Sequence, residues 1–334
     1  MQVLSALLLG LVLWPGRPTP TPRPVAIVPE LDSVDIKEWP VPWERTRPRD
    51  PYVGPDGKVW FVGQQGHYVA YLVPSTGEFK RYELEPGTGP HNLIVDQQGA
   101  VWFAGNLKGY IGKLDPKDGK ITKFETPGVR DPHTLIFDQK GDIWFTAQQA
   151  NHLGKLTVAT GTVRVIPVPT PDARPYGIGI DSKGRPWAVL VGTNKIGTVD
   201  PATMQVREIT LPRAEARPRR VAITSDDRIW YVDFAAGYLG RYDPVTSEFK
   251  EWPAPAGARA RPYGMAVDDR DRIWFVEIGA ESANFVGFDT KKGEFFSSTP
   301  VSGNIRHMYY HRPAQEIWFG TDAGNIGRAK LPTS

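Results

Sequence analysis

One tryptophan recurs through most of the chain at a nearly constant interval. Successive members lie 42, 42, 43, 43, 44 and 44 residues apart, at Trp60, Trp102, Trp144, Trp187, Trp230, Trp274 and Trp318. A period of about 40 to 50 residues is typical of β-propellers and other repeat arrays, in which each unit packs against its neighbours. The interval therefore divides the chain into seven equivalent units, and the fold has to accommodate all of them.

Each unit contains four short runs with the composition of β-strands. In the second unit these runs cover residues 90–96, 101–103, 110–115 and 121–127, and each is bounded by Gly, Asp or Pro. The chain contains 34 Gly and 32 Pro, which supply the many turns that such short strands require. No window has a sustained helical period. The sequence therefore predicts an all-β fold, a seven-bladed β-propeller with four-stranded antiparallel blades.

The two ends of the repeat predict how the ring closes. The seventh unit stops after its third strand-like run, at residues 325–330. Residues 34–40 end in Lys-Glu-Trp-Pro, the same four residues that end the outer run of the fifth unit at 249–253. We therefore expect the N-terminal strand to complete the last blade and to remove an exposed sheet edge. This assigns residues 34–332 to the propeller.

Residues 1–33 differ from the repeat. An apolar run of twelve residues at 3–14 is shorter than the roughly 20 residues that span a bilayer, and a Pro-rich tract follows at 18–24. The pattern predicts a signal-like segment and a tether, and hence a periplasmic or secreted protein without an integral membrane span. The alternative is a cytoplasmic protein with an unusual N-terminus.

Composition excludes several functional classes. Hydrophobic residues make up 40% of the chain and charged residues 23%, as in ordinary soluble globular proteins. The net charge of +3 and the absence of a Lys or Arg run argue against a nucleic-acid partner. The sequence contains no cysteine, which excludes disulfides, thiolate zinc sites and a cysteine nucleophile. We expect the partner to be a small molecule and the protein to be a monomer.

The predicted propeller brings one residue of each unit to the central channel. The innermost strand of a blade lines the channel, and the position eleven residues before the repeated tryptophan marks the start of that strand. The residues at this position are all large and polar: Arg49, His91, His133, Tyr176, Arg219, Tyr263 and His307. Seven such side chains at one mouth predict a ligand site.

Hairpin geometry predicts the partners of these residues. A turn centred near residue 98 places residue 91 opposite residue 105, and directly opposite residues have neighbouring side chains. The same rule pairs Arg219 with Asp233, Tyr263 with Glu277 and His307 with Thr321. The first pair could be a structural ion pair and the second a simple hydrogen bond. The three histidines of the set could share a metal only if the channel is narrow.

The repeat also resembles a known family. Its unit reads Pro-(His/Tyr), four residues, then Asp-x-x-Gly-x-(Ile/Val)-Trp-Phe, as at 132–145 and, with Asp271 in place of the Gly, at 262–275. This unit resembles the repeat of the virginiamycin B lyase (streptogramin lyase) family. The resemblance covers residues 34–332, and NHL-repeat propellers are similar. It implies an enzyme that opens a cyclic depsipeptide by elimination at an ester bond, using a histidine base and Mg²⁺.

The resemblance also implies where catalytic residues lie. In that family the histidine base lies in a late blade, with one Glu two residues before it and another fourteen after it. On this chain the base falls on His307 or on Tyr263, depending on which blade is matched. The flanking positions hold Ile305 and Thr321 in the first case and Arg261 and Glu277 in the second. Only one of these four residues is a carboxylate, whereas Mg²⁺ prefers several oxygen ligands.

Two functions remain open. The first is a carbon–oxygen lyase-like enzyme that acts on a cyclic ester or another polar small molecule. Its base would be His307, His133 or His91, with Glu277 or Asp233 orienting the base or holding a cation, and with arginines stabilising negative charge. The second is a non-catalytic, NHL-like propeller that binds an anionic or sugar-like ligand. In both, the residues expected to bind the ligand are Arg49, Tyr176, Arg219, Tyr263, Asp233 and Arg261.

Overall fold

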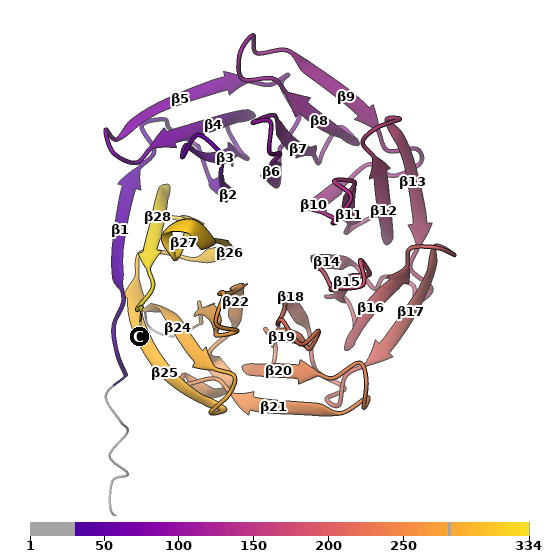
Figure 1. Cartoon of the computed structure of the whole chain (residues 1–334), viewed down its shortest axis with the longest axis vertical. Helices are drawn as coiled ribbons and strands as arrows, with labels where there is room; N and C mark the ends of the chain where they lie inside the picture. The colour runs from indigo at the N-terminus through magenta and orange to yellow at the C-terminus, as the bar shows by residue number, and fades with distance from the viewer. Residues whose placement is uncertain (1–30, 280–281, 334) are drawn as a thin grey trace, which may run out of the picture. The chain divides into compact units, whose positions relative to one another are not determined.

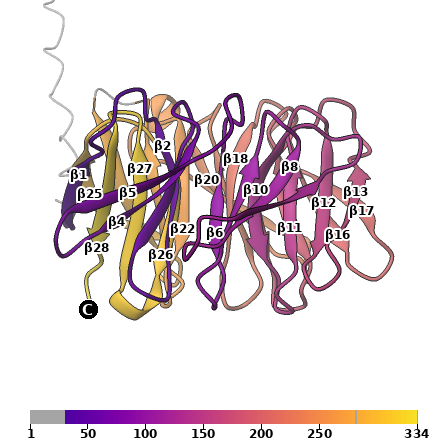
Figure 2. The same cartoon turned by 90° about the horizontal axis from the view of Figure 1, so that it is seen from above.

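The chain folds into a ring of blades around a central channel (Figure 1). The computed structural model describes residues 31–279 and 282–333. Within these ranges the chain forms seven four-stranded antiparallel sheets, which confirms the predicted seven-bladed propeller. Seen from the side, the innermost strands run between the two faces of the ring, so their two ends lie at opposite mouths of the channel (Figure 2).

In the first six blades the strands follow one another from the channel outward. The innermost strands are β2 (Pro48–Val53), β6 (Leu93–Val95), β10 (Pro132–Phe137), β14 (Pro175–Ile180), β18 (Pro218–Ile223), β22 (Pro262–Val267) and β26 (Ile305–His311). The second strands are β3 (Val59–Gly63), β7 (Val101–Gly105), β11 (Ile143–Ala147), β15 (Pro186–Leu190), β19 (Ile229–Asp233), β23 (Ile273–Glu277) and β27 (Glu316–Thr321).

The third strand of each blade lies between the second strand and the outer strand. These strands are β4 (Tyr68–Val73), β8 (Tyr110–Leu114), β12 (His152–Thr157), β16 (Lys195–Asp200), β20 (Tyr238–Tyr242), β24 (Ala283–Asp289) and β28 (Asn325–Lys330). The outer strands are β5 (Glu78–Glu83), β9 (Ile121–Glu125), β13 (Thr162–Pro167), β17 (Gln205–Thr210), β21 (Phe249–Pro253), β25 (Glu294–Val301) and, in the last blade, β1 (Asp35–Pro40). Two short 3₁₀ turns are η1 (Gly257–Arg259) and η2 (Arg312–Ala314). In the part of the chain that the structure describes, no helix has the length and apolar character needed to cross a membrane.

The N-terminal strand closes the ring, as predicted. β1 pairs antiparallel with β28, from Asp35 opposite Lys330 to Pro40 opposite Asn325. The ring of Trp39 stacks on that of Trp318, with centroids 5.5 Å apart. Residues 1–30, which hold the predicted signal-like segment and most of the tether, lie outside the described residues. Export therefore stays a prediction.

The repeated Asp, Gly and Trp form one hydrogen-bonded unit. The carboxylate of Asp96 accepts hydrogen bonds from the backbone N–H of Gln98 and Ala100 and from the indole N–H of Trp102, at 2.9–3.0 Å. Gly99 has a φ of +85°, a conformation that glycine adopts without strain. Equivalent bonds recur at Asp138, Asp181 and Asp268. The motif therefore fixes the hairpin between the two inner strands and holds its tryptophan in the core.

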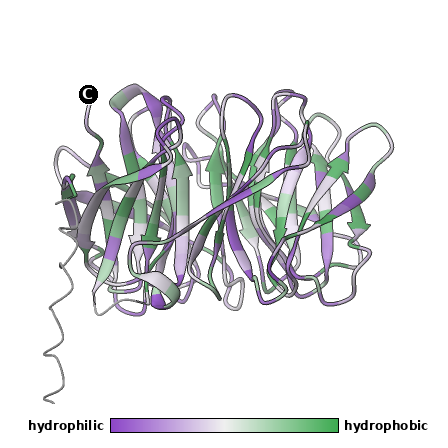
Figure 3. Ribbon diagram, turned by 90° about the horizontal axis from the view of Figure 1, so that it is seen from below, coloured by the Kyte–Doolittle hydropathy of each residue, from purple (hydrophilic) through white to green (hydrophobic). Residues whose placement is uncertain are grey.

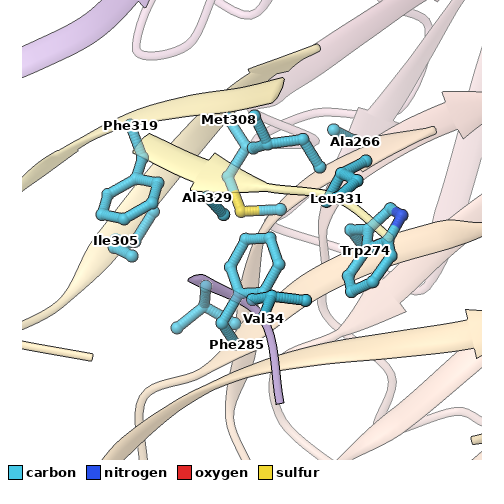
Figure 4. Close-up of a cluster of buried hydrophobic side chains, with 11 residues drawn as sticks. Val34, Ala266, Trp274, Phe285, Ile305, Met308, Phe319, Ala329 and Leu331 are labelled. Carbon is cyan, nitrogen blue, oxygen red and sulfur yellow. The ribbon is translucent and has the colours of Figure 1, made fainter. Parts of the chain in front are cut away.

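Hydrophobic residues gather between adjacent blades rather than in one central core. Figure 4 shows one such cluster, in which Val34 from the chain start packs with Phe285 and Met308 of the last two blades. Coloured by hydropathy, the ribbon is hydrophobic mainly along the strands, whereas much of the connecting loops is hydrophilic (Figure 3). Each cluster joins neighbouring blades. This packing holds the inner strands, and therefore the channel residues, in fixed positions.

Candidate functional site

Six of the seven innermost strands are irregular near the predicted site position. In β22, Pro262 pairs with Glu277 and Met265 with Phe275, so Tyr263 and Gly264 together face one residue of β23. Similar register shifts occur in β2, β10, β14, β18 and β26. A β-bulge of this kind changes the direction of the side chains that it contains.

The bulges make the predicted cross-strand pairs wrong. Asp233 lies opposite Pro218, Glu277 opposite Pro262 and Thr321 opposite Ile305, because the rule assumed regular pairing without an extra residue. The other assumed partners, Arg219, Tyr263 and His307, lie within the irregular segments.

The two buried carboxylates instead hold loops at the mouth. Asp233 accepts hydrogen bonds from the backbone N–H of Arg217, Ala235 and Ala236, at 2.9, 3.1 and 3.3 Å. Glu277 accepts one from Ala256 at 2.9 Å, and burial raises the pKa of its carboxyl. Each carboxylate, at the end of its strand, therefore holds the backbone of neighbouring loops in place.

Five of the seven predicted residues form a continuous chain of contacts. Arg49 Nη2 lies 3.1 Å from His91 Nε2, and the ring of His91 packs on His133 with centroids 3.6 Å apart. The ring of His133 lies 4.3 Å from that of Tyr176, whose hydroxyl is 2.5 Å from the hydroxyl of Tyr263. All five side chains are buried. The structure thus brings these residues together across the channel.

Four buried polar residues complete the network and were not predicted. Asn92 donates a hydrogen bond to Asp50 at 2.9 Å, and Arg220 Nη1 donates one to Thr134 at 3.4 Å. Thr134 also lies 2.9 Å from the imidazole of His133. Each of the four stands one residue after a predicted site position, where strict alternation would turn it away from the channel. Their polarity in an otherwise apolar strand was the available signal.

Asp50 is the buried anion of the network. Its carboxylate lies 3.6 Å from Arg49 Nε and 3.9 Å from Arg220 Nη2. Burial alone would raise the pKa of Asp50, but the charge that His307 gains at low pH, the charges of Arg49 and Arg220 and the hydrogen bond from Asn92 outweigh it and lower the pKa to about 2. Asp50 is therefore ionised at neutral pH.

The third channel histidine is His307, on β26 of the last blade. Together with Asn92 and Thr134 it lines a cavity of about 360 Å³, whose remaining walls are mostly aliphatic side chains of the inner strands. Burial lowers the pKa of His307 to about 4 and lowers the pKa of His91 and His133 well below the usual value. All three imidazoles are therefore neutral at neutral pH. Among the described residues, no three His, Asp or Glu side chains are placed to hold a metal ion.

Arg219 and Arg261 lie at the mouth beside aromatic rings. The guanidinium of Arg219 is 4.4 Å from the ring centroid of Phe234 and 5.4 Å from that of Tyr263. The guanidinium of the exposed Arg261 lies 5.8 Å from the ring of Phe234. Such contacts hold a cation over an aromatic face without neutralising its charge.

Two further arginines at the mouth share one carboxylate. Arg306 Nη2 lies 2.7 Å from Asp322 Oδ2, and Arg47 Nε lies 3.8 Å from Asp322 Oδ1. The guanidinium of Arg306 is also 5.5 Å from the ring of Tyr263. The mouth therefore has more guanidinium groups than carboxylates to balance them.

The two channel tyrosines respond differently to this charge. Burial alone would raise the pKa of Tyr263, but the charges of Arg220, Arg49 and Arg219 and the hydrogen bond from Tyr176 outweigh it, so the pKa is lowered. Burial, and the neighbouring Tyr263, raise the pKa of Tyr176 to about 12. Tyr263 is thus the hydroxyl of the pair that loses its proton first.

Comparison with solved structures finds the same propeller elsewhere. A streptogramin B lyase is 26% identical with a TM-score of 0.79, over 89% of this chain and 98% of that one. A catalytically inactive virginiamycin B lyase from Staphylococcus aureus, solved with quinupristin, is 24% identical with a TM-score of 0.81, over 90% and 100% of the two chains. Hydrazine synthase from Kuenenia stuttgartiensis, at 14% identity and a TM-score of 0.74 over 88% of this chain and 98% of that one, shares the fold alone.

The comparison of sequences is more specific. A search of curated protein sequences found no match. The sequence profile of the Virginiamycin B lyase family matches residues 26–249, about two thirds of the chain. With the shared propeller and the repeat unit described above, this match shows that the chain belongs to the Virginiamycin B lyase family.

Proposed function

We propose that this chain is a carbon–oxygen lyase that acts on a polar small molecule at the channel mouth, with Tyr263 as its base. Family membership supports elimination chemistry. The observation that carries the assignment is the Tyr263 hydroxyl, which is hydrogen-bonded to Tyr176 while its ring lies near the guanidiniums of Arg219 and Arg306.

The positive charge of the mouth favours a tyrosine over a histidine as the general base. A cationic environment disfavours the protonated form of an imidazole and favours the deprotonated form of a phenol. Burial first, and then the neighbouring positive charges, lower the pKa of His91 and His133 and make them weak bases, whereas the lowered pKa of Tyr263 brings its basic form closer to neutral pH. A general base works best when its pKa lies near the working pH.

The residues present do not fit the Mg²⁺ site that the family resemblance implies. Of the two flanking positions at Tyr263, Arg261 is a cation and the Glu277 carboxylate is bound to the backbone of Ala256. At His307 the flanking residues, Ile305 and Thr321, carry no charge. Mg²⁺ needs oxygen ligands, and anionic ones above all. We therefore assign charge stabilisation to the arginines and route no step through a metal.

The proposed step is a β-elimination. The phenolate of Tyr263 removes the proton from the carbon next to the substrate carbonyl. The electron pair of that C–H bond forms a carbon–carbon double bond, and the bond from the adjacent carbon to the ester oxygen breaks. The departing carboxylate keeps the electrons of the broken bond. Arg219 stabilises the negative charge that develops on the carbonyl oxygen.

The first test is a Tyr263→Phe substitution with two measurements. Absorbance at 295 nm should show one tyrosine of the wild type titrating below the usual pKa of about 10, and this transition should be lost in the variant. Turnover of a streptogramin B and of simple β-acyloxy acids and amides should fall about 10²- to 10⁴-fold, the usual contribution of a general base.

Tyr71→Phe is the matched control. Tyr71 lies on the third strand of the first blade, against Trp60 rather than at the channel. This variant should keep both the early titration and the turnover. If Tyr263→Phe turns over as fast as the wild type, Tyr263 is not the base. If the wild type titrates early but turns over no ester, the alternative of ligand binding without catalysis is favoured.

A further inference from the structure

The buried charged side chains that contact one another inside the channel do not balance. Arg49, Arg220 and Asp50 are each 5% exposed or less, and their sum is one positive charge. The neighbouring imidazoles of His91 and His133 are neutral at neutral pH, so they add none. Burying an uncompensated charge is unfavourable by several kcal/mol, on the order of the penalty for breaking a buried ion pair. The network therefore lacks an anion.

Two guanidiniums that lie near the same aromatic ring have unused donors. Arg219 and Arg220 lie 5.9 and 5.0 Å from the centroid of the same ring, that of Tyr176. Within the described ranges, Arg219 Nε and Arg220 Nη2 are buried nitrogen atoms without a hydrogen-bond partner. The nearest carboxylate oxygen to Arg220 Nη2 belongs to Asp50 at 3.9 Å, which is too long for a hydrogen bond.

The rest of Arg220 is fixed by the fold. Its Nε donates to the backbone carbonyl of Arg306 at 2.8 Å, and its Nη1 donates to Thr134. These bonds come from two other blades, so the guanidinium is oriented before any ligand arrives. A preorganised donor loses little entropy when it binds an anion. The unused Nη2 is therefore a buried donor held in a fixed position, unlike the donors of a mobile surface arginine.

We infer that the substrate carries a carboxylate, and that Arg219 and Arg220 bind this group beside Tyr263. The inference names the substrate class of the proposed function and rests on it for the chemistry. A carboxylate is small and planar, and two N–H donors from guanidiniums match its two oxygens. It would supply the missing negative charge. Placed on the carbon that loses its proton, it would also spread the developing charge onto oxygens already held by arginine.

The inference can be tested by binding alone. Several groups set the titration of Tyr263: Tyr176, Arg49, Arg219, Arg220 and Arg306. Malonate bound between Arg219 and Arg220 should neutralise part of this charge and raise the titration midpoint of Tyr263 by about one unit. The midpoint is the difference between the 295 nm titrations of wild type and Tyr263→Phe at constant ionic strength. Malonamide, the neutral analogue, should leave it unchanged.

Variants locate the site. Arg219→Gln should abolish the response to malonate, whereas Arg164→Gln, on the exposed outer strand of the third blade, should retain it. The melting temperature gives a second readout that needs no titrating tyrosine. It should rise with malonate in the wild type, in Arg164→Gln and in Tyr263→Phe, and stay constant in Arg219→Gln.

The outcomes separate this inference from the proposed function. A malonate response with full turnover by Tyr263→Phe would support the carboxylate site and reject the base. Absence of any malonate response in the wild type would overturn the carboxylate site. So would a response that persists in Arg219→Gln, or one that phosphate produces and malonate does not.

Discussion

At the scale of single residues, Asp50 is the group on which the polar network depends most. It is the one carboxylate among the channel residues that are more than nine-tenths buried and in contact with Arg49, Arg220 and Asn92. Without it, two buried guanidiniums would face each other across the channel with no anion between them. Its role is therefore to offset the positive charge of Arg49 and Arg220, so that both guanidiniums can be buried in the channel.

Replacing this carboxylate should destabilise the protein strongly. Asp50→Asn leaves two buried guanidiniums without their anion, and breaking a buried ion pair typically costs about 3–5 kcal/mol. The free energy of unfolding, measured by urea denaturation at neutral pH, should fall by that order. Asp322→Asn is the control, because its carboxylate is 26% exposed and such pairs contribute about 0–1 kcal/mol.

The pH dependence of the same variant follows from the pKa. The folded-state pKa of Asp50 is about 2, below its unfolded value of about 3.9. Its stabilising contribution is therefore complete above the unfolded value and is lost as the pH falls towards 2. Asp50→Asn should lack this part of the acid dependence. Equal urea midpoints for the two variants, or equal acid profiles for wild type and Asp50→Asn, would contradict this account.

At the scale of the element, the inner strand shows what sequence reasoning could and could not provide. The phase of the repeat brought Arg49, His91, His133, Tyr176 and Tyr263 to one place, and the structure shows these five side chains in contact, because counting back from the tryptophan does not depend on strand geometry. The pairing of Tyr263 with Glu277 failed, because a bulge is local and shifts the register by one residue. Separate bulges in β2 and β18 lie at Asp50 and next to Arg220, and strict alternation could not anticipate that these two side chains join the network.

The third strand allows a matched test of packing. A Cβ atom on Gly154 of β12 would overlap the ring of Phe145, the residue opposite it on β11. Gly197 of β16 holds the same position one blade later, but faces Ala188, and its nearest neighbour atom would lie at 3.6 Å. Gly154→Ala should therefore lower stability by about 1–3 kcal/mol, as overpacked core sites do.

Gly197→Ala should change the stability by no more than about 0.5 kcal/mol or raise it slightly, because alanine is less flexible than glycine in the unfolded chain. Thermal or urea unfolding of the two variants side by side measures the difference. If both substitutions had the same effect, the aromatic ring opposite Gly154 would not be the reason for glycine in this strand.

At the scale of the whole molecule, one blade is made from both ends of the chain. The shared Lys-Glu-Trp-Pro ending made this closure predictable, because β1 and β21 occupy the same outer position in different blades. The difference between them is covalent. β21 follows β20 through a short turn, whereas β1 is held to β28 by hydrogen bonds and side-chain packing alone. Its side chains therefore decide whether the ring stays closed.

Trp39 and Trp252 provide the test of this idea. They occupy equivalent places in β1 and β21, and each stacks on the repeated tryptophan of its own blade, at 5.5 and 5.4 Å. Trp39→Ala should remove about 3–5 kcal/mol, the usual effect of deleting a large buried side chain. Hydrogen exchange should also accelerate along all of β1 and β28, since opening the ring exposes both strands. Trp252→Ala should lose less stability and show faster exchange in β21 alone, because its turn keeps the strand in place. Unchanged protection of β28 in Trp39→Ala would show that the ring stays closed without this contact.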